Sequence, residues 1–154
     1  MDDFYKTANR CFYSSKILHD NAEYFNACYL GGYVLECYGK LIFRKIYSTP
    51  PEDMKCYGHD VKKIKSEIQQ LLADPSLSGL LNPLYIIDLA HNCPTITGGS
   101  SRWDLIKRYT DAAIWDQVTS PNYQQEIVIL KSMISKMKVD GIIWKVQNMI
   151  LQKY

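Results

Sequence analysis

Apolar residues recur at helical spacing along most of the chain. A repeat of this period along one side of a segment predicts an amphipathic helix. Residues 2–20 carry such a stripe, made of Phe4, Ala8, Cys11, Phe12, Ser15 and Leu18. Residues 24–47, "YFNACYLGGYVLECYGKLIFRKIY", are apolar nearly all round and predict a second helix that is buried on several sides. This helix should end near Ser48, because Pro50 and Pro51 disfavour helical backbone immediately before them.

Three further helices are predicted from capping residues and apolar stripes. Asp60 is a suitable N-cap for a third helix, which Pro75 would close. Asn82 followed by Pro83 predicts a short fourth helix that ends at about His91. The third helix would bury Val61, Ile64, Ile68, Leu71 and Leu72.

The last helix should open at Ser120 and Pro121 and run to about Gln152, with Ile127, Leu130, Ile134, Met137 and Trp144 on its buried side. The segment "CPTITGGSS" is typical of a flexible loop, and the apolar residues of 102–115 show no clear helical or strand period. No stretch alternates for long enough to predict a strand. The expected class is all-α, a single domain over residues 1–154 that forms an antiparallel bundle of about five helices.

Composition and charge exclude some classes of protein. The net charge is only +2 and no basic tail is present, so a large nucleic-acid footprint is not expected. The first residues, "MDDFYKTANR", are polar and acidic, unlike a signal peptide. The longest apolar run is too short and too interrupted to span a bilayer. We therefore expect a cytoplasmic protein without a membrane partner, whose five cysteines are reduced and mostly packed as small hydrophobic residues.

Glycines interrupt the most apolar helix. Gly32 and Gly39 lie seven residues apart, on nearly the same side of residues 24–47. A glycine inside a helix costs roughly 1 kcal/mol relative to alanine, so a neighbouring backbone that must come close is the natural reason for it. The neighbour could be a second copy of the chain, in a two-fold homodimer through Gly32, Gly39 and Tyr33. The alternative is tight packing within a monomer.

A pair of charges stands in the same helix. Glu36 and Lys40 are the only charged residues between Glu23 and Arg44. They have the i, i+4 spacing and the carboxylate-first order that favour an ion pair. In so apolar a helix we expect this pair to be partly buried, and the alternative is a salt bridge on the helix surface.

A family resemblance follows from these residues. The 24–43 segment resembles the central helix of HEPN domains, small helical bundles with the pattern Tyr, then A-x-Y-L-x-G-Y, then E-x-x-x-K. "GHDVKKI" at 58–64 resembles the segment that opens the next helix of that family, and "WDLIKRYT" at 103–110 resembles its Trp…Arg-Tyr element. The resemblance covers roughly residues 3–140. The residues that match the pattern of the central helix are Tyr24, Ala27, Tyr29, Leu30, Gly32, Tyr33, Glu36 and Lys40.

The resemblance implies a dimeric bundle associated with nucleotides, RNA or nucleotidyltransferase partners. Many HEPN members are metal-independent ribonucleases of toxin–antitoxin and antiviral systems, which carry an arginine, four to six residues, and then a histidine. No arginine of this chain is followed by a histidine at that interval. The expectation is therefore a non-catalytic binding module without a catalytic residue, cofactor or metal. The ligand-binding residues we expect are Glu36, Lys40, His59, Trp103, Arg108 and Tyr109.

Each of these residues has an expected role. Lys40 and Arg108 would supply positive charge, Trp103 or Tyr109 would stack on a base, and Glu36 would orient Lys40 or Arg108. If the chain packs as the resemblance implies, residues 103–110 return to the region of Glu36 and Lys40. Alternatively, Arg108 pairs with Glu36 and only fastens this segment to the helix.

Other functions stay open from the sequence. A divergent ribonuclease would combine Arg108 and His59, and a purely structural subunit would bind a nucleotidyltransferase or a toxin or antitoxin and no small ligand. "TGGSS" follows no predicted strand and is a weak phosphate-loop candidate. A tetrahedral zinc site would need four soft or borderline ligands, and the chain offers two close pairs, but their spacing is not a standard one. These pairs are Cys56 with His59 and His91 with Cys93.

Overall fold

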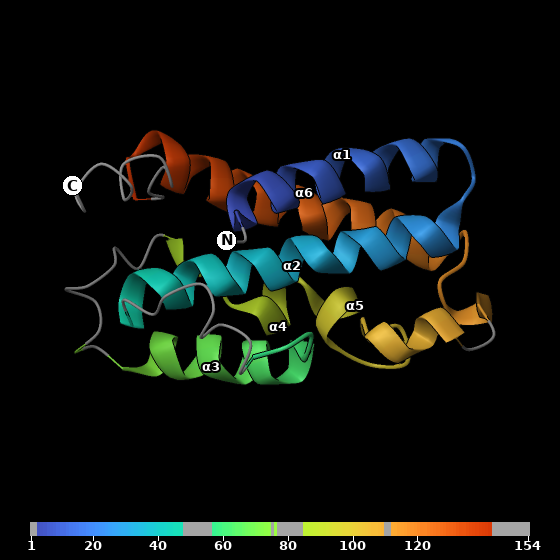
Figure 1. Ribbon diagram of the computed structural model, residues 1–154. Helices are drawn as coiled ribbons and strands as arrows, with labels where there is room; N and C mark the ends of the chain where they lie inside the picture. Colours follow the sequence, from blue (N-terminus) through green and yellow to red (C-terminus); the bar gives the residue numbers. More distant parts are fainter. Residues whose placement is uncertain (1–2, 48–56, 75, 77–84, 110–111, 143–154) are drawn as a thin grey trace.

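The fold is all-helical throughout the described ranges. The computed structural model describes residues 3–47, 57–74, 76, 85–109 and 112–142, and within them it contains no strand (Figure 1). The long helices are α1 (Phe4–Asp20), α2 (Tyr24–Tyr47), α3 (Val61–Ala73) and α6 (Thr119–Val139). Between α3 and α6 lie α4 (Leu89–Asn92), α5 (Pro94–Thr97) and two 3₁₀ helices, η4 (Leu105–Tyr109) and η5 (Ala112–Ile114). The predicted all-α class is confirmed. None of the described helices is both long and apolar enough to cross a lipid bilayer.

Local capping explains where two of the long helices begin. The side chain of Asp3 accepts a hydrogen bond from the backbone nitrogen of Lys6 at 3.0 Å, and Asp60 accepts one from Lys63 at 3.1 Å. Each carboxylate satisfies an amide of the first helical turn that has no partner within the helix. The third helix therefore starts where Asp60 predicted it.

The helices are only partly antiparallel, which corrects the expected bundle. α1 runs against α6, because Ser15 contacts Gln124 near the start of α6 while Tyr5 lies under Lys138 near its end. α1 and α2 are joined by a short turn and also run in opposite directions (Figure 1).

α3 runs in the same direction as α2. His59, just before α3, meets Glu36, whereas Ile64, one turn later, meets Gly39. Figure 1 shows α2, α3 and α6 sharing one direction, with α1 alone reversed. Periodicity predicts which face of a helix is buried, but not the direction in which a helix returns after a long connection.

α2 forms the centre of the fold. It packs against α1, α3 and α6, and most of its residues from Ala27 to Ile46 are buried. The expected burial of this helix on several sides is therefore confirmed, and the surrounding helices belong to the same chain. The four cysteines in the described ranges, Cys11, Cys28, Cys37 and Cys93, are all buried, as expected.

The two glycines of α2 that predicted a dimer contact are covered by this chain. A Cβ atom on Gly32 would lie 1.9–2.1 Å from atoms of the Trp103 indole ring. A Cβ atom on Gly39 would lie 2.4 Å from Cγ2 of Ile64 in α3. Tyr33 also packs against Trp103, with ring centroids 4.9 Å apart. The glycines thus serve close packing within one chain, which was the alternative explanation.

The segment before α6 differs from its prediction. Residues 86–88 are not helical, and the helix begins only at Leu89, where the carboxylate of Asp88 accepts hydrogen bonds from the amides of Ala90 and His91. The predicted helix start at Asn82 and Pro83 lies outside the described residues.

α5 occupies part of the predicted flexible loop. The buried carboxylate of Glu126 in α6 accepts hydrogen bonds from the amides of Thr95 at 2.6 Å and Ile96 at 3.2 Å. Burial raises the pKa of Glu126 above its usual range. A carboxylate from a distant helix therefore caps α5, and no local pattern could have predicted this.

The last helix ends earlier than expected. α6 stops at Val139, and Gly141 follows with a left-handed φ of 74°. Glycine adopts this conformation without steric penalty, so it commonly terminates a helix. The predicted continuation to Gln152, with Trp144, lies outside the described residues. The predicted buried residues Ile127, Leu130, Ile134 and Met137 are confirmed.

Substitution of Gly32 tests the contact with Trp103. Gly32→Ala should lower the free energy of unfolding by about 1–3 kcal/mol, because the added methyl group would overlap the indole ring. Gly31→Ala is the matched control, since its Cβ would meet other atoms only at 3.4–3.5 Å. This control should be neutral or more stable by up to about 1 kcal/mol, from the better helix propensity of alanine. Urea unfolding measures both variants, and equal stabilities would contradict the packing described.

Candidate functional site

A line of polar and aromatic side chains follows one side of α2. Tyr29, Tyr33, Glu36 and Lys40 succeed one another at spacings of four, three and four residues, which places them on the same helix face. The turn before α3 and the segment from Gly98 to Tyr109 lie against this line. Two sequence motifs that are far apart in the chain, around His59 and around Trp103, are thereby brought to the same face.

Glu36 is the polar centre of this line. The ammonium of Lys40 donates to its Oε1 at 2.6 Å, and Nδ1 of His59 lies 2.7 Å from its Oε2. Glu36 is only 5% exposed and Lys40 only 7%. The predicted pair is therefore a buried ion pair and not a surface salt bridge. Burial of a charge requires such partners, because the carboxylate has lost its hydration.

His59 connects this buried pair to the surface. Its side chain is 47% exposed, and within the described part of the chain its Nε2 makes no hydrogen bond. A buried carboxylate on Nδ1 fixes the orientation of the ring, as in sites where an imidazole transfers a proton. The exposed Nε2 is therefore the part of this network that faces solvent.

Tyr33 and Tyr29 continue the line away from Glu36. The ring of Tyr33 meets that of His59 edge to face, with centroids 5.8 Å apart, and its hydroxyl lies 3.0 Å from the hydroxyl of Tyr29. Burial raises the pKa of Tyr33 above its ordinary value, and the hydrogen bond to Tyr29 adds to this shift. The hydroxyl of Tyr33 is therefore neutral at physiological pH.

Trp103 is a packing residue. It is 1% exposed, its ring fills the space left by Gly32, and its Nε1 donates to the backbone oxygen of Tyr29 at 2.8 Å. A ring in this position has no face open for a base. Of the two rings expected to offer stacking for a base, Trp103 or Tyr109, Trp103 is therefore excluded, whereas Tyr109 is 82% exposed.

Arg108 lies at the outer end of the line. Its guanidinium stands over the rings of Tyr29 and Tyr109, at 5.7 and 5.9 Å from their centroids. Glu36 is paired with Lys40 and His59, and among the described residues it makes no ion pair with Arg108, so the alternative in which Arg108 pairs with Glu36 gains no support.

The segment around Arg108 also returns to a different part of α2 than expected. Trp103 meets the helix at Gly32 and Tyr33, and Arg108 meets it at Tyr29, seven residues before Glu36. At a rise of 1.5 Å per residue, this corresponds to about 10 Å along the helix axis. The sequence predicted a return to Glu36 and Lys40 because the direction of the segment could not be read from it.

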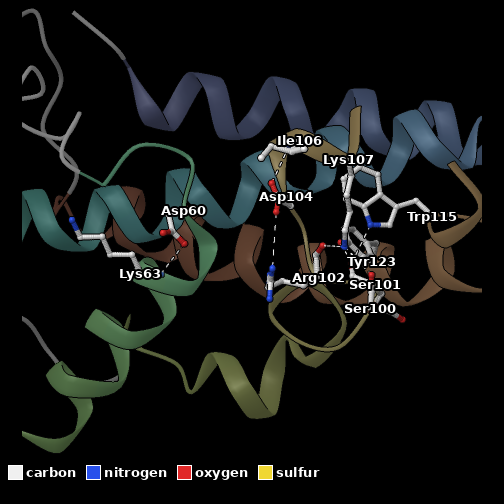
Figure 2. A network of polar contacts seen from close by, with 10 residues as sticks. All are labelled: Asp60, Lys63, Ser100, Ser101, Arg102, Asp104, Ile106, Lys107, Trp115 and Tyr123. Carbon is white, nitrogen blue, oxygen red and sulfur yellow. Dashed lines mark hydrogen bonds and ion pairs between the residues drawn. The ribbon is translucent and has the colours of Figure 1, made fainter. Parts of the chain in front are cut away.

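Lys107 and two buried rings hold this segment in place (Figure 2). The ammonium of Lys107 donates to the backbone oxygens of Ser100, at 2.8 Å, and Arg102. The oxygen of Ser101 accepts from Nε1 of Trp115 at 3.0 Å and from the hydroxyl of Tyr123. Burial lowers the pKa of Lys107. The carbonyls of Ser100 and Ser101 in the "TGGSS" region thus bind donors of the protein itself.

One contact between chemically active residues had no signal in the sequence. Nδ1 of His19 lies 2.8 Å from Oγ of Ser120, which is 101 positions away. Ser120 is completely buried, and burial raises the pKa of neighbouring Cys28 to about 12. Ser120 and Cys28 are therefore not available as nucleophiles. The contact of His19 with Ser120 joins the end of α1 to the start of α6.

A zinc site gains no support from the described residues. They contain no group of three or more histidine, cysteine, aspartate or glutamate side chains arranged to hold a metal. His59 is bound to Glu36, and Cys93 is fully buried. Cys56, which the sequence paired with His59 in the possible zinc site, lies outside the described residues.

No family model, curated protein or solved structure matches this chain. The resemblance to HEPN domains therefore rests on the motifs quoted above.

Removal of Glu36 tests the buried pair. Glu36→Leu should lower the free energy of unfolding by about 3–5 kcal/mol, because Lys40 would remain buried without a counter-charge. The double variant Glu36→Leu/Lys40→Met should recover most of this loss, since it buries no charge. Chemical denaturation of the two variants and of Lys40→Met completes the cycle. Additive losses would mean that the two side chains do not interact.

Proposed function

We propose that this chain is a non-catalytic, HEPN-type binding module that holds a phosphate-bearing ligand, a nucleotide or RNA, at Arg108. The observation that carries the proposal is the environment of this residue. Arg108 is exposed, lies over two tyrosine rings and, among the residues described, has no carboxylate partner. A cation without a counter-ion beside an open aromatic ring has the chemistry that a nucleotide requires.

The two groups would divide the recognition. The guanidinium of Arg108 can donate two parallel hydrogen bonds to a phosphate, which a lysine cannot do. Tyr109 offers an exposed ring on which a base can stack. Tyr29 would orient the guanidinium from below. Glu36, Lys40 and Trp103 would act indirectly, by fixing the face of α2 on which the segment rests.

A divergent ribonuclease is the second candidate, favoured by the orientation of His59 on buried Glu36. The separation of Arg108 and His59 along α2 argues against this candidate. Arg108 and His59 meet α2 at levels that are about 10 Å apart along the axis, whereas a general acid or base must be within hydrogen-bond reach of the group it serves. The contacts that connect the two residues run through the rings of Tyr29 and Tyr33.

A homodimer, or a complex with a nucleotidyltransferase or a toxin or antitoxin, is the assembly that the HEPN resemblance implies. Because this chain itself covers Gly32 and Gly39, the second surface has to lie elsewhere. Two strongly exposed apolar side chains are Ile106 (68%), in the η4 helix that carries Arg108, and Val118 (71%), directly before α6, and these are the positions we propose for the contact.

Ligand binding at Arg108 can be measured by calorimetric titration with ATP, GTP and a short single-stranded RNA. The wild-type protein should bind at least one of these, and Arg108→Lys should weaken that binding about tenfold, because the second parallel hydrogen bond is lost. The melting temperature should change little, since Arg108 is exposed. Arg10→Lys, an exposed arginine on α1, is the matched control and should bind like the wild type. Absence of binding to all three probes by the wild type would refute the proposal.

The ribonuclease alternative is tested by incubating the protein with structured and single-stranded RNA, with and without divalent metal. We expect no cleavage, because no arginine of this chain is followed by a histidine at the interval that HEPN ribonucleases carry. Cleavage that persists through repurification and disappears in His59→Ala would instead establish the enzyme.

Sedimentation equilibrium at micromolar concentration tests the assembly. The expected mass is twice the 17.8 kDa of one chain. Val118→Lys should shift the equilibrium toward the monomer, because a charge would enter the apolar contact. Val139→Lys, at another strongly exposed valine, should leave it unchanged. A wild-type protein that sediments as a monomer would exclude the dimer.

A further inference from the structure

Positive charge is concentrated on the outer side of α1 and α6, although the chain as a whole is nearly neutral. Within Thr119–Val139 the only carboxylate is Glu126, which is buried and bound to the amides at the start of α5. The same helix carries Lys131, Lys136 and Lys138. The exposed side chains of α6 are therefore neutral or positive.

Contacts between lysines and tyrosines join the two helices along this side. The ammonium of Lys131 lies 5.9 Å from the ring centroid of Tyr5 and 6.0 Å from that of Tyr13. The ammonium of Lys138 lies 4.8 Å from the ring centroid of Tyr5. We call this surface the basic face and define it as Tyr5, Tyr13, Lys16, Ile17, Val128, Lys131 and Lys138.

The basic face also exposes apolar side chains. Tyr13 is 57% exposed, Ile17 62% and Val128 52%. Ile17 follows Tyr13 by one helical turn, and Val128 precedes Lys131 by one turn, so the contact of Lys131 with Tyr13 brings these residues together. The result is a strip of apolar side chains with lysines beside it.

The lysines of this face have no counter-charge in the described ranges. In the part of the chain that the structure describes, no ion pair involves Lys16, Lys131 or Lys138. Lys131 instead donates to the hydroxyl of Ser135 at 2.9 Å. The charge of these ammonium groups is thus available to an external anion.

We propose that the basic face docks an acidic amphipathic helix of a partner protein. An apolar stripe on such a helix would cover Tyr13, Ile17 and Val128, and carboxylates at its edges would meet the lysines. Binding of this kind uses anchors at i, i+3, i+4 and i+7 of the partner helix. The charge complementarity would guide association and fix the register.

Charge and ring contacts favour this occupant over two others. A single-stranded nucleic acid binds by stacking its bases on aromatic rings, but two of the three strongly exposed apolar side chains of this face, Ile17 and Val128, are aliphatic and only Tyr13 offers a ring. Residues 143–154 of this chain contain two lysines and no carboxylate, so their charge does not match the face. The basic face shares no residue with the ligand site proposed at Arg108, and the two proposals can fail independently.

Selection from a phage-displayed library of helical peptides against the full chain tests the proposal. The enriched peptides should combine an apolar stripe of helical period with an excess of Asp and Glu. Lys131→Glu/Lys138→Glu should weaken their binding about tenfold or more, because both charges change from attractive to repulsive. Lys62→Glu/Lys65→Glu on α3 is the matched control and should bind like the wild type. Ile17→Ser should weaken binding without changing its dependence on salt.

Circular dichroism establishes that each variant is folded before it is titrated. Three results would overturn the proposal: no enriched peptide, enriched peptides without acidic residues, or equal binding by the two charge-reversal variants. A labelled single-stranded RNA that binds the wild type, loses affinity in Lys131→Glu/Lys138→Glu and keeps it in Arg108→Lys would assign the face to nucleic acid instead.

Discussion

The contact of Trp103 with α2 is the constraint on which the candidate site depends. Because Gly32 has no side chain, the indole ring reaches the helix and donates to the backbone oxygen of Tyr29. The position of the ring fixes where the following 3₁₀ helix begins, and with it the place of Arg108 over Tyr29. Hydrogen bonds donated by Lys107, Trp115 and Tyr123 hold the loop that directly precedes Trp103. The exposed groups of the site thus stand on a rigidly packed support, as precise recognition requires.

The packing of the candidate site also depends on a buried charge in α2, that of Glu36. An apolar residue at position 36 would pack without the loss of hydration that a carboxylate suffers. Glu36 instead holds Lys40 on one oxygen and His59 on the other, so it connects the central helix to the turn that precedes α3. A directional contact of this kind specifies one orientation of the turn, which an apolar contact would leave less defined. The half-exposed imidazole is the part of the network that solvent and ligands can reach.

The sequence predicted those features whose signals are local. The bounds of α2 follow from continuous apolar character and from Pro50 and Pro51, and the start of α3 follows from its cap, Asp60. The sequence predicted the Glu36–Lys40 pair because its two members are one helical turn apart. The cap of α5 by Glu126, the partner of Gly32 and the level at which Arg108 meets α2 could not be predicted. Each depends on how distant segments return to the central helix, and periodicity contains no information on this.

The long sequence separation of the Trp103 contact has a consequence for how the chain folds. α1 and α2 are neighbours in sequence and can pair early, but Nε1 of Trp103 and the Tyr29 oxygen that it meets are 74 positions apart. Closing so large a loop slows the formation of a contact. A newly made chain therefore passes through a stage in which the face of α2 around Gly32 lacks its cover. During synthesis this stage lasts until residue 103 has left the ribosome, and exposed apolar surface of this kind favours aggregation. The glycine that permits close packing in the finished fold thus also makes the chain dependent on a late step.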